Sequence, residues 1–115
     1  MMLIFVYNAN SGSFNALIDI ARRVFSPQTY PCNLCAITYS ATGMRREWSR
    51  FLRGLDTPFE FLHRDEFNER YDVDGVILPA VFKRNGRKLT VLIDAEAINS
   101  CQNLEELIQL VKSKI

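Results

Sequence analysis

A short, continuous apolar run near the start of the chain, residues 3–7, most constrains how this chain can fold. The run shows no alternation of polar and apolar residues, and it ends in the polar, glycine-containing stretch 8–13. This length and pattern predict a β-strand buried on both faces, as in a parallel sheet. Because such a strand must be covered on each side, the run favours an α/β fold with helices on both faces of a sheet.

The rest of the chain alternates helical and strand-like patterns. Apolar residues spaced three and four apart predict a helix over residues 14–25. The further expected elements are a strand at 35–39, a helix at 44–55, a strand at 59–63, a short helix at 65–71, strands at 76–83 and 88–93, and a helix from Asn103. The order β-α-β-α-β-(α)-β-β-α predicts a single domain, residues 1–115, built as a three-layer α/β/α sandwich around a mixed sheet of about five strands.

Two local signals define the last third of the chain. Asn85-Gly86 separates two strand-like runs and predicts a tight β-hairpin with both turn residues in the left-handed conformation. Asn103, followed by Glu106 three residues later, predicts the amino-terminal cap of the last helix. The hairpin is expected to add an antiparallel edge to the sheet.

The overall charge gives no support to several classes of function. The 115 residues carry a formal net charge of +1, which gives no reason to expect a nucleic acid, a charged membrane surface or an acidic tail as a partner. No apolar run approaches the roughly 18 residues that span a bilayer, and the first residues lack the basic region and cleavage site of a secretory signal. The three cysteines are therefore expected to be reduced thiols of a cytoplasmic protein.

Residues 59–115 resemble the second half of the thioredoxin fold. In that family a strand ending in an acidic residue leads through a short helix to a hydrophobic-proline pair, and a strand, a glycine-containing turn, another strand and a helix follow. The matching segments here are Phe61-Leu62-His63-Arg64-Asp65, Leu78-Pro79 within residues 77–82, Asn85-Gly86, residues 89–93 and the helix from Asn103. The resemblance implies a thioredoxin-like domain with a cis Leu78–Pro79 bond that faces the active-site loop.

The first half of the chain departs from the family pattern. Thioredoxin-like proteins carry their cysteines after the first strand, whereas residues 8–13 contain none. An additional strand-helix unit, residues 35–55, also precedes the strand at residue 59. The resemblance therefore places no thiol nucleophile at residues 8–13.

Cys32 and Cys35 form the C-x-x-C pair of the chain. By itself this pattern indicates a dithiol redox site. In the expected topology the first helix returns the chain to the amino ends of the strands, which places both cysteines roughly 15–20 Å from Pro79, across one strand length. Three interpretations stay open: packed thiols where a strand begins, a thiol-disulfide centre, or part of a zinc site needing ligands such as His63 and Cys101.

The carboxyl ends of the strands form a second candidate site, since open α/β sheets bind ligands there. Backbone N–H groups at the start of the first helix could hold an anion, and His63, with Asp65 two residues later, could act as a base held by a carboxylate. No phosphate-binding loop motif is present. The expected ligand-binding residues are Asn8, Asn10, Ser11, Gly12, Ser13, Thr42, His63, Arg64 and Pro79. Arginines 45, 46, 50 and 53 are expected on the solvated face of their helix.

These expectations describe a non-redox binding or accessory module for a small anion or a protein partner, without cofactor or metal, as a monomer or weak homodimer. The competing hypothesis is a thiol-disulfide oxidoreductase that uses Cys32 and Cys35. A third hypothesis is a zinc-stapled interaction module. The position of the two thiols separates the first two hypotheses, because thiols close to Pro79 favour dithiol chemistry.

Overall fold

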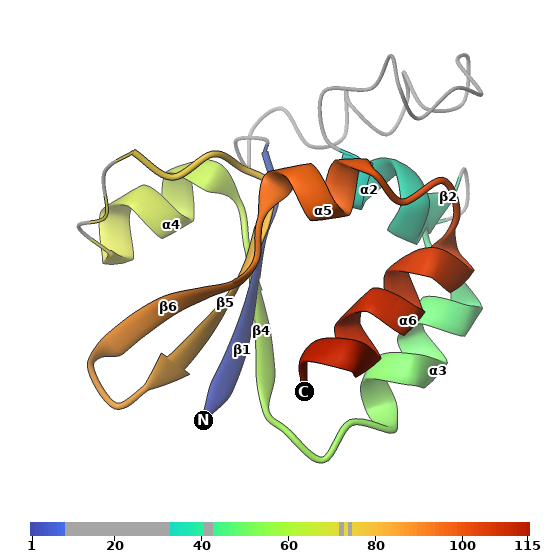
Figure 1. Ribbon diagram of the computed structural model, residues 1–115, viewed down its shortest axis with the longest axis horizontal. Coiled ribbons are helices and arrows are strands. Elements are labelled where there is room, and N and C mark those ends of the chain that lie inside the picture. Colours follow the sequence, from blue (N-terminus) through green and yellow to red (C-terminus); the bar gives the residue numbers. More distant parts are fainter. Residues whose placement is uncertain (9–32, 41–42, 72, 74) are drawn as a thin grey trace.

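The computed structural model describes residues 1–8, 33–40, 43–71, 73 and 75–115. Its elements are β1 Met2–Val6, α2 Asn33–Thr38, β2 Tyr39–Ser40, β3 Gly43–Met44, α3 Arg46–Arg53, β4 Phe59–Leu62, α4 Arg64–Arg70, β5 Ala80–Asn85, β6 Lys88–Ile93, α5 Ala95–Asn99 and α6 Leu104–Lys114. Four strands form one mixed sheet in the order β4-β1-β5-β6, and β2 pairs with β3 in a separate two-stranded ribbon (Figure 1).

The first strand, β1, occupies the interior of the sheet. It runs parallel to β4, with Val6 opposite Leu62, and antiparallel to β5, with Val6 opposite Ala80. The hairpin partner β6 then forms one edge, antiparallel to β5. Residues 3–6 are 0% exposed, so the expectation of a strand buried on both faces is confirmed.

Helices cover both faces of this sheet. Leu3, Phe5 and Tyr7 contribute to one core, together with buried side chains of α2, α3, α5 and α6. Ile4 and Val6 point the other way and share a second core with α4. Figure 1 shows α4 on one side of the sheet and α3 and α6 on the other. The chain is therefore an α/β protein with a mixed four-stranded sheet between helices.

The prediction of a strand at residues 35–39 is wrong. Residues Asn33–Thr38 form α2, and only Tyr39–Ser40 are extended. Leu34, Ile37 and Thr38 are buried, a spacing of three and four residues that suits a helix. Thr38 Oγ1 also donates to the Leu34 carbonyl at 2.6 Å, one helical turn back. A short apolar run does not distinguish a buried strand from a helical segment, and within the described residues the sheet has four strands rather than about five.

One helix was not expected from the sequence, and one strand begins later than expected. The sequence patterns do not predict α5, which begins where the Asp94 carboxylate accepts the Ala97 N–H at 2.9 Å. β5 begins at Ala80 rather than at residue 76, directly after Pro79, which has no N–H to donate to a sheet. The helix expected at residues 14–25 lies outside the described residues.

The hairpin is confirmed, with a shifted turn. Asn85 pairs with Lys88, so the loop consists of Gly86 and Arg87 rather than Asn85 and Gly86. Gly86 has a φ of +60°, whereas no non-glycine residue in the described chain has a positive φ. This is the pattern of a type II′ turn, which needs glycine only at its first central position.

The cap of the last helix is confirmed as well. The Glu106 N–H donates to Asn103 Oδ1 at 2.9 Å, which satisfies one of the free backbone donors at the start of α6. The Glu106 carboxylate in turn accepts the Gln102 N–H at 3.1 Å. The hydrogen bond that the Glu106 side chain returns therefore goes to Gln102, the residue before the cap Asn103.

We expect Leu107→Ala to lower the free energy of unfolding by about 2–5 kcal/mol, because truncating a buried leucine loses burial and leaves a cavity. Leu107 is 0% exposed in the core that α6 shares with the sheet. Ile77→Ala is the control, since Ile77 is 76% exposed and its truncation should change stability by less than about 0.5 kcal/mol. Urea denaturation followed by far-UV circular dichroism measures both variants. Equal losses would contradict the placement of α6.

Candidate functional site at the carboxyl end of β1 and β4

Three strand ends meet at one end of the sheet. Because β1 is parallel to β4 and antiparallel to β5, the carboxyl ends of β1 and β4 lie beside the amino end of β5. Asn8 follows β1, His63 and Arg64 follow β4, and Pro79 directly precedes β5. Pro79 is buried, and the Leu78–Pro79 peptide bond is cis. The topology thus brings four of the predicted site residues to one place.

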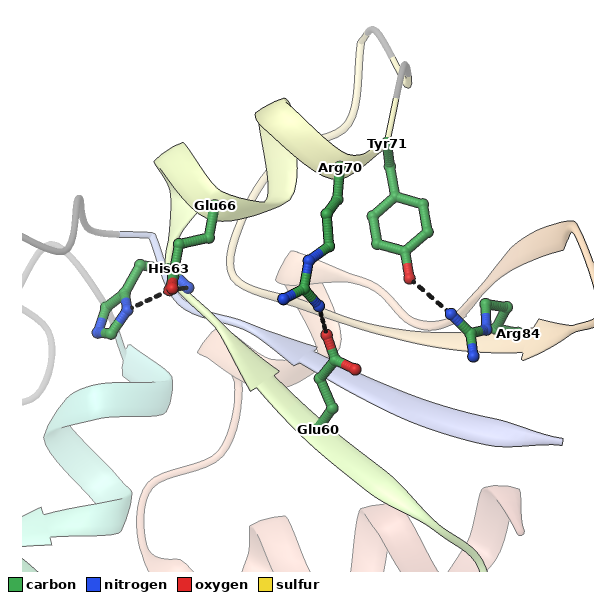
Figure 2. Close-up of polar contacts among 6 residues, drawn as sticks. All are labelled: Glu60, His63, Glu66, Arg70, Tyr71 and Arg84. Carbon is green, nitrogen blue, oxygen red and sulfur yellow. Dashed lines mark hydrogen bonds and ion pairs between the residues drawn. The ribbon is translucent and has the colours of Figure 1, made fainter.

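His63 begins α4 and is held by Glu66. The ring donates from Nδ1 to Glu66 Oε1 at 2.6 Å, and the His63 backbone N–H donates to the same oxygen at 2.9 Å (Figure 2). A carboxylate only accepts hydrogen bonds, so Nδ1 carries the proton. Glu66 is therefore a carboxylate that holds His63, because the third residue of a helix points back to its cap.

Hydrogen bonding also affects the acidity of the Glu66 carboxyl. The backbone N–H of His63 is the main cause, and its ring the next, of a pKa for the Glu66 carboxyl below the ordinary value of 4.5. The His63 side chain is 25% exposed and that of Glu66 is 44% exposed, so water screens their attraction. The main effect of the pair is to fix the orientation of the imidazole at the end of the sheet.

An aromatic layer lies against His63. The Tyr7 side chain is 2% exposed, and its ring centroid lies 5.7 Å from those of both His63 and Phe61. The Tyr39 ring lies 6.2 Å from Tyr7 in an edge-on arrangement. Tyr7 therefore joins β1, β4 and β2 at this end of the molecule. Neither Tyr7 nor Glu66 is among the residues predicted for the site. Tyr7 could have been found as the last residue of the apolar run 3–7, and Glu66 by its capping-box spacing from His63.

Arg64 connects the start of α4 to the end of β1. Its Nη1 donates to Asn8 Oδ1 at 3.3 Å, and the Arg64 side chain is exposed. Two residues predicted to share an anion site therefore do lie together, although they are 56 positions apart. The other predicted ligand-binding residues, Asn10, Ser11, Gly12, Ser13 and Thr42, lie outside the described residues.

The helix that carries Cys35, α2, lies at this same end of the sheet. Figure 1 shows α2 beside α5, which follows the carboxyl end of β6, and Tyr39 directly after α2 contacts Tyr7. The expectation that this segment lies at the amino ends of the strands is therefore wrong for α2. It assumed that residues 35–39 enter the sheet as a strand, whereas they belong to a helix and a short ribbon near the opposite end. Cys32 and the Cys35 side chain lie outside the described part of the structure.

Cys101, by contrast, belongs to the core. It is buried, and its Sγ–H donates to the Ala97 carbonyl at 3.6 Å. Burial is the main cause of a raised pKa for this thiol, which keeps it protonated and a poor nucleophile. Among the described residues no group of three or more His, Cys, Asp or Glu side chains is placed to hold a metal ion. The predicted use of Cys101 and His63 as zinc ligands gains no support from this arrangement.

Two polar contacts tie the end of α4 to the sheet. Arg70 pairs with Glu60 of β4, and Arg84 of β5 donates from Nη1 to the Tyr71 hydroxyl at 3.2 Å (Figure 2). Because these contacts hold the far end of the helix, its first residues stay at the end of the sheet. Arg70 and Tyr71 thus hold the end of α4 that is opposite His63 against the sheet.

We expect Glu66→Gln to reduce stability at about pH 7 by less than about 1 kcal/mol, as for a partly exposed charge pair. A carboxyl with a depressed folded-state pKa contributes stability above its unfolded pKa and loses it as the pH falls through the folded value. The difference between wild type and variant should therefore shrink as the pH falls below 4.5.

Glu69→Gln, on the exposed side of the same helix, is the matched control and should show no such convergence. Urea denaturation at a series of pH values measures all three proteins. A deficit of Glu66→Gln that stays constant down to the acid limit would contradict the assigned role of this carboxylate.

No helix in the described ranges is long and apolar enough to cross a membrane.

Comparisons with protein-family models, with curated proteins and with solved structures found no match. The function of the chain must therefore be inferred from its own fold and residues.

Proposed function

We propose that this chain is a thioredoxin-like thiol-disulfide oxidoreductase that uses Cys32 and Cys35 and acts beside Pro79. The leading expectation from the sequence was a non-redox binding module, and it depended on a large separation between the cysteine segment and Pro79. The position of α2 removes that reason. The placement of α2 at the end of the sheet where β5 begins is the single observation that carries the proposal.

The order of elements from β4 onward supports the thioredoxin-like part of the proposal. The strand β4 leads through the short helix α4 to Leu78-Pro79, and β5, a glycine turn, β6, the additional short helix α5 and then α6 follow. Apart from α5, this is the order of elements on which the resemblance was based. The interior position of β1, parallel to β4, agrees with a first strand that belongs to the same sheet.

The proposed chemistry is a thiol-disulfide exchange. A thiolate of the pair attacks one sulfur of a substrate disulfide, which forms a mixed disulfide and releases one substrate thiolate. The second cysteine attacks the mixed disulfide, so the substrate leaves as a dithiol and the protein keeps a Cys32–Cys35 disulfide. An external dithiol reductant then restores both thiols. Either cysteine of the pair can make the first attack in this scheme, and the other then resolves the mixed disulfide.

We expect the purified wild-type protein to reduce insulin disulfides with dithiothreitol as the reductant. Cys32→Ser and Cys35→Ser should each return the rate to that of dithiothreitol alone, since the exchange needs both sulfurs. Cys101→Ser is the control and should keep its activity, because Cys101 is a buried core thiol. A wild-type protein that is inert toward insulin and toward a small aromatic disulfide would refute the proposal.

A non-redox module that binds a small anion is the second candidate, and the contact between Arg64 and Asn8 favours it. The guanidinium is exposed and donates to an amide oxygen, and a guanidinium fork matches the geometry of an oxyanion. His63 follows β4 directly before Arg64 and lies at the same end of the sheet. The neighbouring backbone could then supply further donors.

If an anion binds here, Arg64→Gln should weaken the binding of inorganic phosphate about tenfold, as expected for the loss of one charged hydrogen bond. Arg87→Gln removes an equal charge from the exposed hairpin turn and should leave phosphate binding unchanged. Titration followed by heteronuclear NMR measures both variants. Equal weakening in the two variants would show a general charge effect and would exclude an anion site at Arg64.

A further inference from the structure

An arginine stripe runs along the outer side of α3. Arg46, Arg50 and Arg53 are spaced four and three residues apart, so they project from one side of the helix over about 10 Å. All three side chains are exposed, as is that of Arg45 directly before the helix. The side of α3 that faces the core is formed instead by Trp48 and Leu52, at 0% and 3% exposure.

The neighbouring helix α6 adds to this charge. Figure 1 shows α3 and α6 side by side, and the ammonium group of Lys112 lies 6.0 Å above the Phe51 ring. This cation–π contact holds a further exposed positive charge next to the stripe. We call Arg45, Arg46, Arg50, Arg53 and Lys112 the basic surface.

Within the described residues, no recorded ion pair involves the basic surface. The ion pairs recorded among the described residues, His63–Glu66 and Arg70–Glu60, involve α4 and β4, and α4 lies on the other face of the sheet. Arg53 Nε makes only a long contact, 3.5 Å, with the Ser49 carbonyl of its own helix. The five cations of the basic surface and Glu47 sum to +4 against +1 for the whole chain, so the other residues sum to −3.

From this asymmetry we infer that the basic surface is a docking site for an acidic segment of a partner protein. Each guanidinium presents a planar fork that matches a carboxylate. Acidic residues at the same four-three spacing on a partner helix could meet Arg46, Arg50 and Arg53 in turn. The local positive potential would also attract such a segment although the whole chain is almost neutral.

A nucleic acid fits this surface less well. Proteins that bind single strands combine a basic groove with aromatic side chains on which bases stack. On α3 the Trp48 ring is fully buried, and the half-buried Phe51 ring is covered by Lys112. The surface therefore offers charges at a helical spacing and no stacking platform.

The test uses an alanine-rich helical peptide that carries glutamates at the four-three spacing and a fluorescent label. We expect binding at about 25 mM NaCl that weakens strongly at about 250 mM, because exposed charge pairs are screened by salt. The triple variant Arg46→Gln, Arg50→Gln, Arg53→Gln should weaken binding about tenfold, as expected for three exposed charge pairs. Fluorescence anisotropy measures the affinity.

A matched triple variant, Lys83→Gln, Arg87→Gln, Lys88→Gln, removes the same charge from the β5–β6 hairpin and should change the affinity less than about twofold if binding is local to α3. Chemical-shift changes in wild-type protein, which should cluster on α3 and the end of α6, locate the peptide without any substitution. The inference is overturned by absent binding at low salt, by equal weakening in both triple variants, or by a single-stranded oligouridylate of equal charge that binds more tightly than the peptide.

Discussion

The burial of β1 on both faces is the constraint on which the rest of the structure depends. Its residues 3–6 are 0% exposed, and burying each such aliphatic or aromatic side chain is worth about 1.5–3 kcal/mol. Successive side chains of a strand point to opposite faces, so Leu3 and Phe5 enter one core while Ile4 and Val6 enter the other. Because β4 and β5 both pair with β1, the point where β1 ends also decides where Asn8, His63 and Pro79 meet.

Apolar packing attaches α4 to the sheet, whereas polar contacts set its orientation. Phe67 is 1% exposed and stacks on Phe82 with 4.8 Å between ring centroids. The Arg70–Glu60 pair is 58% and 23% exposed, so it contributes little to stability. It instead limits how far α4 can rotate about the buried Phe67. Packing of Phe67 thus places α4 on the sheet, whereas the direct contact with Glu66 orients the His63 ring.

The sequence predicts best those elements in which a local signal and burial agree. β1 is a continuous apolar run, the β5–β6 hairpin has Gly86, and α6 has the Asn103 cap, and each of these forms close to where it is expected. The prediction of a strand at residues 35–39, where α2 forms, is wrong because Leu34 and Ile37 suit a strand or a helix equally well over so short a segment. Packing of α2 against α5 decides between the two, and no local pattern encodes that contact.

The same division applies to the candidate site. The alternation of strands and helices was enough to bring Asn8, Arg64 and Pro79 to one end of the sheet, because strand direction fixes which ends meet. Predicting Glu66 as a partner of His63 needed the boundary of α4 to within one residue, since only the third residue of the helix is placed to form a capping box. Sequence patterns place helix ends less accurately than that.

The two proposals share a structural connection and yet depend on different side chains. The Arg45 N–H donates to the Thr38 carbonyl at 2.9 Å, which joins the residue before α3 to the last residue of α2. An acidic segment bound along α3 would therefore reach the junction with the helix that carries Cys35. Docking would then hold a partner next to α2, where the local concentration of its disulfide would rise without any new contact to the thiols. In these two proposals the arginines supply charge and the cysteines supply chemistry, so loss of the basic surface should affect substrate affinity and leave the intrinsic exchange reaction intact.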